Sequence, residues 1–433
     1  MAEAIPNSLD LFEKNAVQSA IVDGRWVEIR PVNSIEETAP IDFRIDGSSE
    51  DFIDLSETYI KAKIRITNAN GNAGYGEGNM VAPVNLILQS MWKKLDVMFN
   101  GKRVSSSSHT YPYRAYLESL LNLTSDVKKG QLSASGWFMD TAHHFNTFGE
   151  ANLGFMSRQR LGRDRNVISL MGKLHADVFN QNRCLIDGVN VDIKLDRSSN
   201  EFCIMRAAEA NAENYKIKLE EVSLFIRKVK VLPSCRLGIY KGLSIAPIRM
   251  PIRRTSQRDF SMPAGITTWS QEGVITGQLP RRLTIGFVGT DASNGAYHEN
   301  PFNFHHFNIN FFTLYINGKQ LPSRALSPDF ANNTTDYVRS FMQMSSGLGH
   351  AFANQDCGVS YSDFQGGNTL FVFNLNSEQT DGEHIERPQR GSVRIEVRFS
   401  QPLPRPITCI VFSEFDSLIL IDKDRNPELD YSV

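Results

Sequence analysis

The sequence has no long apolar run and no excess of positive charge. No window approaches the roughly 18 apolar residues that a membrane-spanning helix needs, so no transmembrane segment is predicted. Lys and Arg number 46 against 48 Asp and Glu, and the net charge of −2 argues against direct nucleic-acid binding by phosphate neutralisation. The first residues, MAEAIPNSLDLFEKNA, have neither a basic region nor an apolar core, and therefore do not resemble a signal peptide.

Cysteine pairs and catalytic motifs are also lacking. The five cysteines are an odd number, are widely scattered and form no Cys-x-x-Cys motif, so we expect free thiols in a reducing compartment. The sequence contains no Gly-x-Ser-x-Gly elbow, no His-Glu-x-x-His and no His-x-His. These absences favour a structural or binding protein over an enzyme, and no cofactor is predicted.

Two histidine pairs keep a metal-dependent enzyme open as an alternative. They are His143-His144 and His305-His306. Adjacent residues on a strand point to opposite faces, so neither pair could supply two ligands to one ion without a bulge. Hydrogen-bonded loop histidines are the simpler interpretation. A duplicated β-sandwich metal-dependent enzyme and a carbohydrate-binding protein therefore stay as alternatives.

Arginines gather in two places. The clusters are Arg158, Arg160, Arg163 and Arg165, and Arg249, Arg253, Arg254 and Arg258. Aromatic residues do not alternate with them, which disfavours a nucleic-acid surface. Ion pairing between domains or subunits is the preferred hypothesis, with plain surface as the alternative.

The chain contains one motif twice, at a spacing of half its length. MWKKLDVMFNGKRV spans residues 91–104, and NINFFTLYINGKQL spans 308–321. Alternating apolar residues before each Asn-Gly predict a strand followed by a two-residue type I′ hairpin, because both turn residues need positive φ. The predicted structural turns are Asn100, Gly101 and Lys102 in the first copy, and Asn317, Gly318 and Lys319 in the second.

Further elements recur in the same order, which indicates an internal duplication. A helix is predicted after each hairpin. Thr110 and Pro112 start the first, whose apolar stripe is Tyr113, Tyr116, Leu117, Leu120 and Leu121. Asp336 caps the second, Val338, Phe341 and Met342 form its stripe, and Gly347 stops it. Alternating strands at 189–195 and 393–399 and closing strands at 222–231 and 416–422 complete the two halves.

The pattern predicts a mainly β protein. About eight strands in each half, with one short helix and long loop insertions, fit a double jelly roll made of two tandem eight-stranded β-sandwich domains. The expected division is an arm at 1–38, a first jelly roll at 39–232, a linker at 233–252, a second jelly roll at 253–425 and a loose tail at 426–433. Residues 123–166 are expected to form a long loop that contacts other subunits.

The segment VNLILQSMWKKLDVMFNGKRV, followed by YPYRAYLESLL, resembles the major capsid (hexon) proteins of Polinton/Maverick elements and adintoviruses. The resemblance covers most of the chain and is strongest at 59–121 and 222–260. It implies a double jelly-roll capsid protein whose homotrimers form pseudo-hexameric capsomers of an icosahedral virion shell. It also implies neighbouring capsomers, a penton protein and minor capsid proteins as partners, with assembly inside the host cell.

Overall fold

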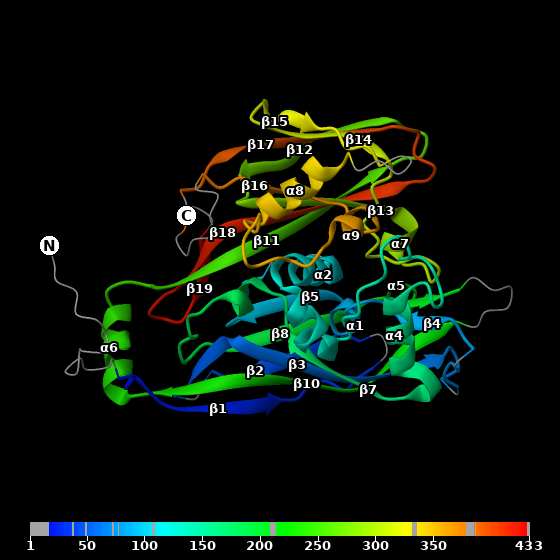
Figure 1. Ribbon diagram of the computed structural model, residues 1–433. Coiled ribbons are helices and arrows are strands. Elements are labelled where there is room, and N and C mark those ends of the chain that lie inside the picture. Colours follow the sequence, from blue (N-terminus) through cyan, green and yellow to red (C-terminus); the bar gives the residue numbers. More distant parts are fainter. Residues whose placement is uncertain are drawn as a thin grey trace, which may run out of the picture.

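Two β-sandwiches lie one above the other and are joined along a broad junction (Figure 1). The computed structural model describes residues 17–36, 39–47, 50–71, 73–76, 78–105, 109–207, 214–330, 336–377, 385 and 387–430. Within these ranges each half of the chain contributes two antiparallel sheets built on four strands each, with a fifth strand added to one sheet of the second half, and the sequence-based prediction of a double jelly roll is confirmed.

The first roll has the sheet orders β1-β10-β3-β7 and β2-β8-β5-β6. The strands of its first sheet are β1 (Ile21–Ile29), β10 (Tyr215–Val231), β3 (Phe52–Asn68) and β7 (Ile168–Lys173). Those of its second sheet are β2 (Ile41–Ile45), β8 (Val191–Arg197), β5 (Trp92–Phe99) and β6 (Lys102–Arg103). A small pair, β4 (Val81–Pro83) and β9 (Ile204–Arg206), is added to this roll.

The second roll repeats these orders as β11-β18-β13-β16 and β12-β17-β14-β15. The first sheet contains β11 (Ile248–Met262), β18 (Ile407–Ile421), β13 (Arg282–Gly289) and β16 (Leu370–Asn374). The second contains β12 (Thr268–Gln278), β17 (Arg390–Phe399), β14 (Ile309–Ile316) and β15 (Lys319–Leu326). Taken in chain order, each of the eight strands named in the two sheet orders of one roll has a counterpart at the same place in the other roll, so the duplication inferred from sequence extends to topology.

Helices lie mostly in the connections. Those of the first half are α1 (Ile87–Ser90), α2 (Tyr111–Asn122), α3 (Ser125–Lys129), η1 (Gln131–Ser135), α4 (Leu153–Gly162), η2 (Arg163–Arg165), η3 (Asp177–Asn180) and α5 (Asn200–Cys203). α6 (Pro233–Leu243) connects the rolls, and α7 (Thr290–Asn294), α8 (Val338–Gly347) and α9 (Tyr361–Gln365) belong to the second half. Of these described helices, none is long and apolar enough to cross a membrane.

The first roll's strands follow the predicted alternation. Along β3, Ile60, Ala62, Ile64 and Ile66 are fully buried, while the intervening basic side chains remain partly exposed. Lys63 pairs with Glu221 at 2.6 Å and Arg65 with Glu220 at 2.6 Å across to β10. This sheet therefore has one buried face and one charged, hydrated face, which is typical of an antiparallel sheet.

Three strands of the second roll's first sheet, β13, β16 and β18, are buried on both faces. Phe371 and Val411 belong to a core enclosed within the second roll. Their neighbours in sequence, Val372 and Phe412, belong instead to the larger core of the first roll, which continues across the junction. β13 is accordingly buried along its whole length, and β18 nearly so, because the first roll covers their outer faces.

The two predicted helices are present as α2 and α8, but their N-terminal ends and, for α8, the buried face differ from the prediction. In α2 the whole predicted stripe is buried, whereas Thr110 makes no side-chain cap bond. The stripe predicted for α8 is wrong at Val338, which is exposed; Phe341 is half-buried and packs against the core, and Met344 and Gly347 are buried. A Cβ on Gly347 would lie 2.3 Å from the carbonyl oxygen of Val372. This glycine thus permits close packing of α8 on β16, and the helix begins after Tyr337 rather than after Asp336.

Four expectations about the segments between the strands need correction. Residues 21–29 of the expected arm form β1, which pairs with β10 of the same chain, and residues 1–16 and 37–38 lie outside the described part. The expected linker contains α6 and the start of β11. Residues 427–430 of the expected loose tail form β19 (Pro427–Asp430) on β18, since that part of β18 extends past β13. The presumed loop at 123–166 contains α3, η1 and α4, and its polar buried side chains conceal the helical period.

Candidate functional site: the junction between the two jelly rolls

Both Asn-Gly turns have the backbone geometry of a type I′ hairpin. Asn100 and Gly101 have φ of 46° and 79°, and Asn317 and Gly318 have φ of 50° and 81°. The lysines that follow, Lys102 and Lys319, pair with Phe99 and Ile316 respectively and are exposed.

The side chain of each turn asparagine also accepts a hydrogen bond from a backbone amide at the start of a neighbouring strand. Asn100 Oδ1 accepts a hydrogen bond from the amide of Asn190 at 2.8 Å, and Asn317 Oδ1 accepts one from the amide of Ser392 at 3.0 Å. The first turn makes an additional contact, because Asn100 Nδ2 donates to the carbonyl oxygen of Arg425 at 2.9 Å. The first turn is therefore part of the junction between the rolls.

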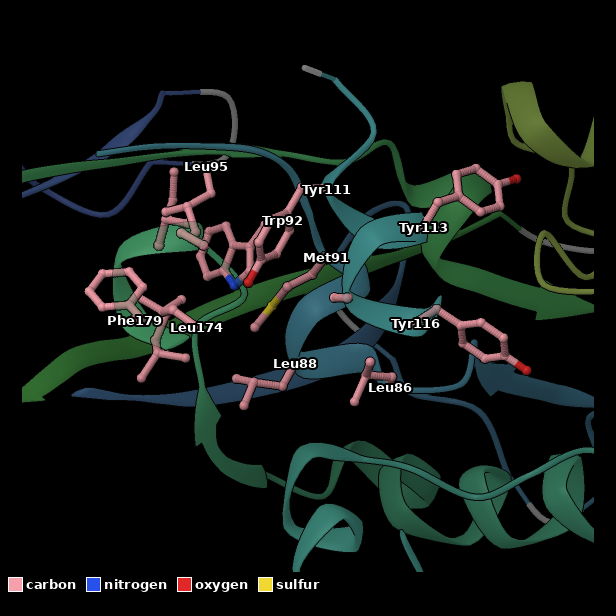
Figure 2. Packing of buried hydrophobic residues seen from close by; sticks show 14 of the residues in the cluster. Leu86, Leu88, Met91, Trp92, Leu95, Tyr111, Tyr113, Tyr116, Leu174 and Phe179 are labelled. Atoms are coloured by element: carbon pink, nitrogen blue, oxygen red, sulfur yellow. The ribbon is translucent and has the colours of Figure 1, made fainter. Parts of the chain in front are cut away.

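Helix α2 supplies the aromatic centre of the junction. Figure 2 shows Tyr111 turned toward Trp92 in the first roll, whereas Tyr113 and Tyr116 point the other way. Tyr116 stacks on Phe302 of the second roll with ring centroids 4.2 Å apart and an interplanar angle of 2°. Tyr113 meets the same ring edge-on at 5.7 Å. The helix predicted from sequence thus joins the rolls as well as covering one of them.

A buried ionic network crosses the junction beside α4. Arg158 is fully buried, and its Nη2 lies 2.6 Å from Asp140 Oδ1. Asn152 donates to the same carboxylate oxygen at 2.9 Å, and Asn300 of the second roll donates to Asp140 Oδ2 at 2.8 Å. Since a buried charge is tolerated only when it is paired and hydrogen-bonded, this network ties the insertion at 123–166 to the second roll of its own chain.

A second network lies where η3 meets β11. Arg114 of α2 contacts Asp177 at 2.7 Å and Glu118 at 2.9 Å, and His175 contacts Glu118 at 2.8 Å. Although burial raises it, the pKa of Glu118 falls to about 2 because Arg114 and His175 lie beside the carboxylate. Asp177 also accepts the backbone amide of Thr255 at 3.2 Å, which links this network to the second roll. No sequence motif identifies either network, because the contacts that cross the junction join residues far apart in the chain.

The histidine pairs occupy hydrogen-bonded positions near the same junction. His305 and His306 stack on each other at 4.3 Å, and each Nδ1 accepts a backbone amide, from Phe307 at 2.9 Å and from Asn308 at 3.0 Å. Burial, together with Arg405 and His143, lowers the pKa of His305 to about 4. His144 contacts the Thr147 hydroxyl at 3.3 Å. Across the described residues no group of three or more His, Cys, Asp or Glu side chains is arranged to hold a metal ion.

The arginine clusters do not act as units. Arg158 is buried in the first network, Arg160 is exposed, and Arg163 lies 3.3 Å from Asp164. In the second cluster, Arg254 lies over the ring of Phe415, and Arg258 donates to the carbonyl oxygen of Val274 at 2.9 Å. The ion pair of Arg158 is formed with Asp140 of the same roll, and the neutral side chain of Asn300 reaches that carboxylate from the second roll, so the preferred hypothesis of ion pairing between domains does not hold for Arg158. The side chain of Arg165 lies outside the described part.

The architecture is that of the double jelly-roll proteins, in which two jelly rolls stand side by side in one chain. No family model matches the chain. It is 26% identical over 427 residues to an uncharacterised protein of Caenorhabditis elegans, and the match covers 95% of this chain and 98% of that one.

Solved structures with this fold come from viral shells. A chain of the Sputnik virophage has a TM-score of 0.63 at 13% identity, covering 100% of this chain and 93% of that chain. The Faustovirus major capsid protein has a TM-score of 0.59 at 8% identity, with coverage of 95% and 92%. The mavirus major capsid protein has a TM-score of 0.56 at 11% identity, with coverage of 100% and 96%. At these identities the likeness establishes the fold alone.

Proposed function

We propose that the protein is a major capsid protein that assembles as a homotrimer with a pseudo-hexameric outline and tiles an icosahedral virion shell. The observation that carries the proposal is the repetition of one sheet topology in two rolls of one chain. Two similar but unequal units per chain allow a ring of six units to be built from three copies under closed cyclic symmetry. The likeness in fold to viral capsid proteins supports the same function.

The proposal extends to partners and place. Neighbouring capsomers, a penton protein and minor capsid proteins are the expected partners, within a virion capsid assembled inside the host cell. The Polinton/Maverick and adintovirus lineage is the proposed family, on the resemblance carried by residues 59–121 and 222–260. The role is structural and non-enzymatic, and the net charge of −2 disfavours direct binding of the genome.

The oligomeric state tests the proposal. Light scattering on the purified protein is expected to give three times the chain mass of 48.7 kDa, and negative-stain images should show particles with six corners. A stable monomer or a twofold dimer at micromolar concentration would contradict the capsomer. The insertion at 123–166 is not a suitable target for deletion, because Asp140 and Arg158 hold the two rolls of one chain together.

A further inference from the structure

The turn between β18 and β19 of the second roll docks on the first roll. β18 ends at Ile421, and the following turn presents Arg425 to the first roll. Arg425 Nε donates to the carbonyl oxygen of Asp187 at 2.8 Å, while the Arg425 carbonyl accepts the side-chain amide of Asn100 at 2.9 Å. Within one chain, the turn after β18 of the second roll therefore contacts the end of the first roll that carries the Asn100-Gly101 hairpin.

The register of the strands identifies the matching positions in the other roll. Val231, the last residue of β10, pairs with Ile21 of β1, and Ile421, the last residue of β18, pairs with Ile248 of β11. The segment that begins at Leu232 and continues into α6 therefore occupies on the first roll the place that the Arg425 turn occupies on the second.

The surface beside the Asn100 turn, which the Arg425 turn contacts, corresponds to a surface beside the Asn317 turn of the second roll. The Asn100 side chain accepts the amide of Asn190, and the Asn317 side chain accepts the amide of Ser392. Counting back three residues from each amide, Asp187 of the first roll corresponds to Gln389 of the second. Asp187 receives Arg425, whereas Gln389 lies on the wall of a cleft of about 340 Å³. The walls of this cleft include Leu279, Pro280, Ile316, Leu321 and Pro388.

Helix α6 has the chemistry to enter such a cleft. Its side chain Leu237 is 55% exposed, and Ile245, just past its end, is 87% exposed. Its other side is fixed to the first roll, because Tyr240 donates to Asp187 and Arg236 lies 3.2 Å from Glu50. Figure 1 shows α6 standing at one end of the molecule, clear of the main body of both sandwiches. An anchored helix with exposed apolar side chains is a surface suited to a protein partner.

We propose that α6 of one copy binds in the cleft beside the Asn317-Gly318 turn of the next copy. The contact repeats between copies the arrangement that the Arg425 turn and the Asn100-Gly101 turn make within one copy. The contact is heterologous, and a heterologous contact forms a ring of three copies when the rotation from one copy to the next is one third of a turn, as the proposed trimer requires. The inference rests on the proposed capsid assembly and identifies the two surfaces that hold it together.

Cross-linking tests the pairing directly. Cys235 lies in the first turn of α6, and Gln389→Cys places a second thiol on the cleft wall. Treatment of assembled protein with a short bis-maleimide should give a ladder that ends at a covalent trimer on a denaturing gel. Adding Cys235→Ser to the same protein should abolish the ladder, and Glu272→Cys, at an exposed position of β12, should give none.

Disruption of the contact provides the second test. Leu237→Asp should convert the trimer to a monomer with an unchanged melting temperature, because the side chain is largely exposed in the single chain. Leu153→Asp, at a side chain that is 69% exposed on α4, is the matched control and should stay trimeric. A trimer that gives no ladder, or that survives Leu237→Asp, overturns this inference and leaves the proposed function standing. A parent protein that remains monomeric overturns the proposed function itself.

Discussion

The two jelly rolls share one strand order but differ in what covers their first sheets. In the first roll the outer face of this sheet carries ion pairs such as Lys63–Glu221 and is hydrated. In the second roll the matching face carries Val372 and Phe412 and is covered by the first roll. The same topology therefore accommodates an alternating sequence in one roll and nearly continuous apolar runs in the other. Burial of a face, rather than strand order, sets the pattern of residues.

The rolls also differ in how independent their cores are. The second roll encloses a core of its own, whereas the core of the first roll continues across the junction and takes in residues such as Phe302. Tyr116 and Asp140 reach the second roll from insertions between strands of the first. We therefore expect the junction to be part of the folded unit rather than a hinge.

The largest predicted effect comes from breaking the ionic network that joins the unequal rolls. Asp140→Ala removes the partner of the fully buried Arg158 and the acceptor of Asn300. We expect a loss of about 3–5 kcal/mol in the free energy of unfolding, since an uncompensated buried charge remains. Urea unfolding followed by fluorescence measures the loss. Arg25→Ala, which breaks a largely exposed pair with Asp51 in the first roll alone, should cost about 1 kcal/mol or less. Equal costs would contradict the assigned role of the junction.

Lowering the pH should reduce the stability of the folded protein through His305, which lies in the second roll near the junction. Burial, reinforced by Arg405 and His143, lowers the folded-state pKa of His305 to about 4, below the ordinary value of 6.5. The neutral form is favoured in the folded state, so its stabilising effect is full above pH 6.5 and is lost as the pH falls toward 4. We expect a loss on the order of 2–3 kcal/mol over this range. Comparing the unfolding of the parent and of His305→Gln from pH 7 to pH 4 tests this, and a parent with the same pH dependence as the variant would refute it.

The two hairpin glycines should be equally sensitive to substitution. Gly101 and Gly318 have φ near 80°, and no neighbouring atom lies within 4 Å of a Cβ built on either. Gly101→Val and Gly318→Val should each cost about 1–3 kcal/mol, because a β-branched residue is forced to positive φ without any steric clash to add. Thermal unfolding of both variants provides the measurement. If both melt like the parent, the turns are not structural determinants.

The smallest predicted effect is the difference in stability between the Asn100→Ala and Asn317→Ala variants. Asn100→Ala removes the bonds to Asn190 and Arg425 and a long bond to the carbonyl oxygen of Gly188 at 3.4 Å, whereas Asn317→Ala removes the bond to Ser392. Both replacements place alanine at similar positive φ, so that contribution cancels in the comparison. Asn100→Ala should therefore be more destabilising by about 0.5–1.5 kcal/mol, the usual net value of one hydrogen bond. The reverse order in urea unfolding would exclude the proposed contact with Arg425.

Local patterns in the sequence were enough for the duplication, the β class, the Asn-Gly hairpins and the position of α2. Each depends on neighbours in the chain: alternation of residues such as Ile60 and Lys61, the need of Asn100 and Gly101 for positive φ, or the helical spacing of Tyr113 and Tyr116. Such short-range requirements are visible in a single sequence.

Only the tertiary structure decided which face of α8 is buried, where residues 21–29 and 427–430 pair and how the rolls are joined. The prediction was wrong at Val338 because the buried face of α8 contains Met344 and Gly347, and Gly347 permits the close approach to β16. Asp140, Arg158 and Asn300 acquire their roles only when distant segments meet, since Asp140 and Asn300 lie 160 residues apart in the chain. A polar residue has the same local signature in solvent as in a buried network, and the free energy that distinguishes the two arises from burial in the folded chain.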